Sequence, residues 1–317
     1  MKKATLMPRR SPLSFSAIVS KSAVTDGLSV TVPISNKENP MKNSRSESST
    51  RISTGVVIAV LILAVLLLSH IPVVLYTSVM VLNLLSIYEI FRAAFMHRST
   101  RLLWSVIACA AALTMIPFPR YVSGLNYIFP LAVLFFFRIM RRCDRFILDV
   151  PVRLCSICLL IVLLFRSIPE IRRMEYGFCA LILAVLSSCA TDIFTYLTGK
   201  KLGKRKLCPK ISPNKTIEGS IGGILASVCI LLLAGKIIEH AAGMNVRYPL
   251  LALYGIFASI IGQFGDLSMS AVKRCLGVKD FGTVFPGHGG VLDRFDSLLF
   301  IAPFTCLFCR CAGIFSS

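Results

Sequence analysis

Charged residues are scarce in this chain. Asp, Glu, Lys and Arg make up 16% of its 317 residues, whereas a soluble domain carries roughly a quarter. The mean hydropathy is +0.75, and the apolar residues come in long blocks that lack a clean period of two or 3.6. The shortage of charge argues against a soluble domain, and the absence of short segments with alternating polarity argues against a β-barrel. The sequence therefore predicts an all-α polytopic integral membrane protein.

The apolar blocks predict about nine transmembrane helices. They cover approximately residues 54–69, 71–91, 102–117, 121–138, 152–168, 176–198, 217–238, 248–272 and 297–314. Several are close to the shortest length that crosses a hydrocarbon core of about 30 Å. The first two nearly fuse at Ser69–Pro72, which predicts either a tight hairpin or one long broken helix.

Basic residues are unevenly distributed between the two predicted faces of the membrane. If the N-terminus is cytoplasmic and nine spans alternate, the cytoplasmic segments hold 28 of the 35 Lys and Arg residues. This asymmetry is what the positive-inside rule expects. It predicts a multi-pass protein of the cell (inner) membrane whose motif-bearing loops face the cytoplasm. Because the bases are dispersed over several membrane loops, a nucleic-acid partner is not expected.

Residues 1–52 differ in composition from the rest of the chain. They are rich in Ser, Lys and Arg, poor in acids, and without a sustained apolar period. This composition predicts a disordered N-terminal extension, with a transit peptide and an alternative start at Met41 left open. The membrane domain is accordingly expected over residues 53–317.

Acids are so few that those within apolar spans stand out. They are Glu89, Asp192 and Asp266. A carboxylate at the bilayer centre costs about 2.5–3.5 kcal/mol, so it normally faces a partner, a cavity or a metal. An ion pair with Arg92 would explain Glu89, with a functional role as the alternative. Asp192 and Asp266 are each followed by polar residues on the same helix face, at a predicted cytoplasmic helix end. This position favours a functional role for both acids.

The basic loop that follows the sixth span ends in Ser212-Pro213-Asn214-Lys215-Thr216. Ser followed by Pro is a good N-cap and first-turn pair, so a helix is expected to start at Ser212. Its free amides and Lys215 would then form an anion site. Binding of lipid headgroups by the basic loop is the alternative interpretation. Further along, Gly219 and Gly223 form a small-xxx-small pair that predicts close helix packing.

The densest chemistry lies in Ser270–Asp296, SAVKRCLGVKDFGTVFPGHGGVLDRFD. Asp266, just before it, and Asp293 within it are the best candidate ligands for Mg²⁺, which prefers carboxylate oxygens and bridges to substrate phosphates. The Gly287-His288-Gly289-Gly290 turn lets backbone approach a phosphate closely. His288 remains open between a general base, a phosphate donor and a loop histidine.

This run resembles the complete hallmark of the phosphatidate cytidylyltransferases, or CDP-diacylglycerol synthases. The resemblance rests on Lys273-Arg274, Lys279-Asp280, the His288-Gly-Gly turn and Asp293-Arg294-Phe295-Asp296, with upstream support from Asp192 and from Ser212-Pro-x-Lys-Thr-x-Glu-Gly219. Asn214 stands where the family usually has a second lysine, which puts only that phosphate contact in doubt.

The resemblance implies a homodimeric enzyme that converts CTP and phosphatidate into CDP-diacylglycerol and pyrophosphate. Mg²⁺ would be held by Asp266 and Asp293, and whether a second, monovalent cation joins it is left open. The implied catalytic residues are Asp266, Asp293, Lys273, Arg274 and His288. The implied substrate-binding residues are Asp192, Ser212, Lys215, Lys279, Asp280, Gly289, Gly290, Arg294 and Asp296.

Two other functions compete with this one. A CTP-dependent lipid-alcohol kinase of the dolichol or phytol type would share the buried acids but transfer a single phosphate. An ion-coupled transporter would place acids near span centres and show paired halves with broken helices. In this chain the acids lie at the predicted cytoplasmic ends and no halves repeat, which argues against the transporter. The full run of Lys279-Asp280, the His288-Gly-Gly turn and Asp293-Arg294-x-Asp296 favours the cytidylyltransferase over the kinase.

Overall fold

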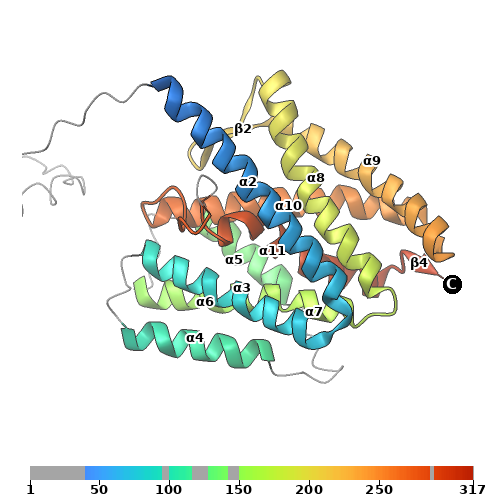
Figure 1. Ribbon diagram of the computed structural model, residues 1–317, viewed down its shortest axis with the longest axis horizontal. Coiled ribbons are helices and arrows are strands. Elements are labelled where there is room, and N and C mark those ends of the chain that lie inside the picture. Colours follow the sequence, from blue (N-terminus) through green and yellow to red (C-terminus); the bar gives the residue numbers. More distant parts are fainter. Residues whose placement is uncertain (1–39, 95–99, 116–127, 142–149, 286–288, 317) are drawn as a thin grey trace, which may run out of the picture. The chain divides into compact units, whose positions relative to one another are not determined.

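A computed structural model describes residues 40–94, 100–115, 128–141, 150–285 and 289–316. The chain divides into two units, Met1–Arg45 and Ser46–Ser317. Most of the first unit lies outside the described residues, and the fold below is that of the second. That unit is built almost entirely of helices (Figure 1).

Each of the nine predicted apolar segments overlaps a helix, and residues 116–117 and 121–127 of the third and fourth segments lie outside the described residues. The helices are α2 (Pro40–Leu67), α3 (Pro72–Ala93), α4 (Thr100–Met115), α5 (Ile128–Arg141), α6 (Val150–Phe165), α8 (Gly177–Leu202), α9 (Ile217–Ala242), α10 (Tyr248–Cys275) and α11 (Leu292–Cys311). A short helix, α7 (Ser167–Arg172), follows α6. Within the described residues, six helices are long and apolar enough to cross a membrane: Ser53–His70, Pro72–Ala93, Leu154–Arg172, Gly177–Leu202, Ile217–Ala242 and Tyr248–Cys275.

The first two segments are separate helices rather than one broken helix. A single 3₁₀ turn, η1 (Leu68–His70), ends α2, and Ile71 adopts an extended conformation before Pro72 opens α3. Proline suits this position because the first turn of a helix needs no amide hydrogen from it. Helix α2 also begins earlier than expected, at Pro40, so residues 40–52 are helical where composition predicts disorder. Extending an existing helix is far less costly than nucleating one.

The fold is not purely helical, because two small antiparallel sheets join the helix ends. Strand β1 (Lys206–Cys208) pairs with β2 (Ser212–Thr216), and β3 (Asn245–Val246) pairs with β4 (Phe315–Ser316). The helix start predicted at Ser212 is wrong, because Ser212–Thr216 is strand β2 of the first sheet. Helix α9 begins at Ile217, with the Thr216 hydroxyl accepting the Gly219 amide at 3.2 Å as the N-cap.

Helices α8 and α9 run side by side (Figure 1) and approach each other through small residues. A Cβ atom built on Gly219 would lie 2.7 Å from the Thr195 carbonyl oxygen, and one on Gly222 would lie 2.5 Å from the Thr198 side chain. A Cβ on Gly223 would likewise collide with the Thr195 hydroxyl. The close packing predicted for Gly219 and Gly223 is therefore confirmed, and it brings the α8 end that carries Asp192 against α9.

Hydroxyl groups link α8 to the two helices that carry the charged motif. The Thr191 hydroxyl donates to Ser259 of α10 at 2.9 Å, and Ser188 and Ser297 of α11 share a hydrogen bond of 2.8 Å. Tyr254 and Thr305 connect α10 to α11 in the same way, at 2.8 Å. Between apolar helices, such polar contacts fix the relative position of neighbours. Helices α8, α10 and α11 consequently form the frame of the site.

Candidate functional site

Asp293, in the first turn of α11, is the anchor of the motif loop, residues 276–291, which joins α10 to α11. Its Oδ1 accepts Lys273 Nζ at 2.9 Å, and its Oδ2 accepts the amides of Phe281 at 3.0 Å and Gly290 at 2.9 Å. Lys273 and Asp293 are both buried. A charged pair in such surroundings is stable only when hydrogen bonds satisfy the rest of the carboxylate. Here Lys273 neutralises the charge of Asp293, and the two backbone amides satisfy the remaining acceptor positions of the carboxylate.

The loop closes on itself at Gly289. Phe285 and Gly289 exchange two backbone hydrogen bonds of 2.9 and 3.1 Å. Gly289 has a φ of +88°, and a Cβ atom there would lie 3.0 Å from Asp293 Oδ2. Only glycine adopts this backbone conformation readily and leaves room for the carboxylate. His288 lies outside the described residues, so its three possible roles stay predictions.

A second ion pair joins the basic loop to α10. Lys215 of β2 pairs with the Asp266 carboxylate, and the Ser270 hydroxyl lies 3.4 Å from the other carboxylate oxygen. This contact places the segment 212–216 beside the charged end of α10, although the two are about fifty residues apart in sequence. The structure therefore brings together two motifs that the sequence shows separately.

Asp192 and Asp296 complete the cluster. The Ser297 hydroxyl donates to Asp192 Oδ2 at 2.8 Å, and the Ser297 amide donates to Asp296 Oδ1 at 2.9 Å. Asp266 is close enough for its charge to act on both of these carboxylates. Ser297 is thus a site residue that the sequence analysis missed, although it directly follows the last acid of the motif.

Four carboxylates in this cluster interact with three bases. The acids are Asp192, Asp266, Asp293 and Asp296, and the bases are Lys215, Lys273 and Arg294. Oxygen donors with an excess of negative charge suit a hard divalent cation in chemical type. Among the described residues, however, no three acidic, His or Cys side chains converge into a ready-made metal site. Lysine ammonium groups instead contact Asp266 and Asp293, the two predicted metal ligands.

The remaining predicted residues belong to the segments that carry or flank this cluster. Arg274 is exposed and donates to the carbonyl oxygens of Ile211 at 3.3 Å and Val278 at 3.1 Å, so it ties the basic loop to the motif loop. Three others have exposed side chains: Lys279, Asp280 and Arg294. Ser212 opens β2. The side chains of Arg274, Lys279, Asp280 and Arg294 are therefore accessible at the surface of the described structure.

The start of α9 differs from the predicted anion site. The Glu218 carboxylate accepts the Lys204 amide at 3.0 Å and the Arg205 amide at 3.2 Å. With Thr216 as N-cap and an acid in the first turn, this helix start already has its own negative charge. The prediction of free helix-start amides at Ser212 is wrong, because residues 212–216 form strand β2. The Lys215 side chain nevertheless reaches the cluster.

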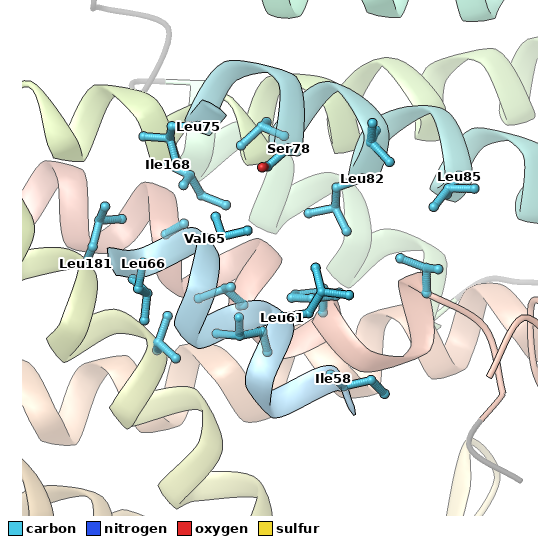
Figure 2. Close-up of a pocket in the computed structure, with 18 of the residues that line it drawn as sticks. Ile58, Leu61, Val65, Leu66, Leu75, Ser78, Leu82, Leu85, Ile168 and Leu181 are labelled. Carbon is cyan, nitrogen blue, oxygen red and sulfur yellow. The ribbon is translucent and has the colours of Figure 1, made fainter. Parts of the chain in front are cut away.

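An apolar cavity of about 420 Å³ reaches the same loop. Figure 2 shows side chains of α2, among them Leu61 and Val65, facing Ser78 and Leu82 of α3 across it. The wall also includes residues around the motif loop, namely Phe285, Val291 and Phe295. The cavity therefore extends from the apolar helices to the segment that Asp293 anchors.

Comparison with known proteins gives a consistent result. The sequence profile described as "Cytidylyltransferase family" matches residues 49–312. The chain is 48% identical over 141 residues to a phosphatidate cytidylyltransferase of Bacillus subtilis (strain 168), covering 44% of this chain and 51% of that relative. It is 46% identical over 127 residues to one of Staphylococcus epidermidis, covering 40% and 47%.

A third relative is the uncharacterized protein YnbB of Escherichia coli (strain K12). It is 46% identical over 121 residues, which cover 38% of this chain and 39% of that protein. The chain thus spans about half the length, or less, of the curated relatives it matches. Because the family profile covers most of the chain, the conclusion about family is direct: this protein belongs to the cytidylyltransferase family.

Proposed function

We propose that this protein transfers the cytidylyl group of CTP to phosphatidate, giving CDP-diacylglycerol and pyrophosphate. The observation that carries the proposal is the loop held around Asp293, with Lys273 and Lys215 beside the carboxylate cluster. The 48% identical B. subtilis relative is named for this activity.

In the proposed reaction, a phosphate oxygen of phosphatidate attacks the α-phosphorus of CTP. One P–O bond forms, the bond to the β-phosphate breaks, and its electron pair leaves with pyrophosphate. Phosphatidate is already ionised near neutral pH, so no strong general base is required. Two polyanions must meet, and catalysis therefore depends chiefly on positioning and charge neutralisation.

The bases near the cluster are suited to this task. We propose that Lys215, Lys273, Arg274 and Arg294 hold the triphosphate and the lipid phosphate. Asp266 and Asp293 would hold Mg²⁺, which neutralises phosphate oxygens when bound. Both carboxylates already contact a cation, a lysine ammonium, so their chemistry fits a positively charged ligand. The exposed groups Lys279 and Asp280 would contact the nucleotide from the aqueous side.

For the lipid half of the reaction, we propose that an acyl chain of phosphatidate occupies the cavity between α2 and α3. Its lining is mostly apolar (Figure 2). It also includes Phe285 and Val291 of the motif loop. A chain leaving the bilayer gains little hydrophobic energy there, because lipid tails are as apolar as leucine. The cavity would therefore orient the lipid rather than supply its affinity.

We further propose nine crossings with the cluster on the cytoplasmic side and a homodimeric assembly. The positive-inside asymmetry of the sequence supports the orientation. The six long apolar helices of the described residues support a multi-pass protein of the membrane. A cytoplasmic site would let a water-borne nucleotide meet a membrane-bound lipid.

The test incubates purified protein with Mg²⁺ and CTP labelled in the cytosine ring, once with phosphatidate and once with a lipid alcohol such as dolichol as the acceptor. We expect the label to enter the lipid fraction with an equal amount of pyrophosphate released. Label that stays water-soluble as CDP, with a lipid alcohol phosphorylated instead, would replace this proposal by the kinase. Absence of both products would remove it.

A further inference from the structure

Glu89 of α3 holds the backbone at the start of α11 from a distant part of the chain. Its Oε1 accepts the Val291 amide at 2.7 Å and its Oε2 accepts the Leu292 amide at 3.0 Å. The side chain is buried, with 1% of the residue exposed. We propose that Glu89 is a positioning residue that sets the place of Asp293. The functional part of this inference rests on the proposed reaction.

Two glycines of the motif loop close against the same carboxylate. A Cβ atom on Gly282 would lie 2.6 Å from Glu89 Oε1, and one on Gly290 would lie 2.5 Å from Glu89 Oε2. Contacts this short leave no room for a side chain on either flank of the loop. Glu89 is consequently enclosed by the loop, which is folded around it as well as around Asp293.

Three successive backbone amides are shared between two carboxylates. The Gly290 amide donates to Asp293, and the next two, Val291 and Leu292, donate to Glu89. Amides at a helix start have no partner within the helix and favour a negative charge. Hydrogen bonds to an ionised acceptor are also stronger than those between neutral groups. Glu89 therefore fixes the backbone directly before Asp293.

An ion pair with Arg92 does not account for this acid. The structure records no Glu89–Arg92 ion pair among the described residues. The Arg92 side chain is exposed, and its charge acts on Glu89 more weakly than the two backbone amides do. A buried carboxylate is costly without compensation, and here the compensation comes from the loop amides. Hydrogen bonds from the motif loop thus offset the cost of burying this carboxylate in α3.

The functional consequence follows from the sensitivity of transfer reactions to geometry. A misplacement of about 1 Å lowers a rate by about 10²-fold. Glu89→Gln keeps the size of the side chain but replaces one acceptor with an NH₂ group facing an N–H donor. The Val291–Leu292 backbone, and with it the Asp293–Lys273 pair, should then shift.

The experiment compares Glu89→Gln with Glu170→Gln in the full-length protein. Glu170 is also a buried acid, paired with Arg166 at 3.8 Å and Arg310 at 3.3 Å, and it lies outside the site. Hydrogen exchange of the 289–292 amides and steady-state turnover are measured for both. We expect Glu89→Gln to exchange faster at these amides and to lose about 10²-fold in kcat, with the KM for CTP changed much less.

Glu170→Gln should lower the melting temperature while leaving exchange at 289–292 and kcat per folded molecule as in the wild type. Wild-type exchange in Glu89→Gln would overturn the proposal, and so would equal losses of kcat in both variants. If Glu89→Gln fails to fold, Gly290→Ala tests the same contact from the loop side. If the wild type forms no liponucleotide, the proposed reaction fails, but the exchange result still decides whether Glu89 holds the loop.

Discussion

At the level of single side chains, the site depends on carboxylates that each satisfy several donors. Asp293 accepts one ammonium and two amides, and Glu89 accepts two further amides. Such an acid cannot be exchanged for its amide without leaving a donor unpaired, because an amide has a single acceptor oxygen. The shape of the loop and its charge are therefore set by the same few atoms.

The Lys273–Asp293 pair offers a test of this interdependence. Lys273→Met leaves a buried carboxylate without its cation, which costs about 3–5 kcal/mol, so the melting temperature in detergent should fall clearly. Adding Asp293→Asn removes the unpaired charge. The loss in free energy of unfolding of the double variant should then be smaller, by at least about 1 kcal/mol, than the sum of the losses of the two single variants.

The control for this cycle is Lys236→Met, an exposed lysine of α9, which should leave the melting temperature near the wild-type value. Strict additivity of Lys273→Met and Asp293→Asn would show that the pair contributes nothing as a pair. Thermal unfolding of the wild type, the two single variants, the double variant and the control under one detergent condition supplies the measurement.

At the level of helices, the cavity between α2 and α3 is expected to shape lipid use. Ser78→Phe on α3 places a ring in the cavity. Turnover of a long-chain phosphatidate should fall by about tenfold or more relative to that of a short-chain one, because the ring occupies the space in which the long acyl chain would be oriented. Rates with dioleoyl and dihexanoyl phosphatidate give the ratio.

Val73→Phe is the matched control, since Val73 lies on the same helix, is 69% exposed and does not line the cavity. Its ratio of long-chain to short-chain turnover should equal that of the wild type. If Ser78→Phe lowers both rates equally, or neither, the acyl chain does not lie in this cavity.

The sequence predicted these elements unevenly, and the differences have physical causes. Apolar runs can be read directly from the sequence, so each predicted segment overlaps a helix. The expected helix start at Ser212 is wrong because pairing with β1 competes with the local Ser-Pro signal. Glu89 stands out in the sequence as an acid in an apolar span, but its partners lie about two hundred residues away. No local sequence pattern predicts such a contact. The hydrogen bond between Ser297 and Asp192, which are 105 residues apart, is equally invisible in the sequence.

For the molecule as a whole, the number of crossings fixes where the two ends lie. Nine crossings place the N- and C-termini on opposite faces of the membrane, whereas the six long apolar helices alone would place them on the same face. Fusions of a fluorescent protein and of a phosphatase to each end distinguish these arrangements. We expect fluorescence at the N-terminal end and phosphatase activity at the C-terminal end. The same reporter active at both ends would rule out nine crossings.

The decisive experiment is the turnover of Asp293→Asn, followed as transfer of cytidine label from CTP into the lipid fraction. Asparagine keeps the shape of the residue but lacks the charge and one acceptor that Lys273, Phe281 and Gly290 require. We predict a fall of at least about 10²-fold in a protein that stays folded in detergent, with Glu175→Gln, an exposed acid outside the site, retaining normal turnover. Near-normal label transfer by folded Asp293→Asn would contradict the assignment of the reaction to this carboxylate cluster.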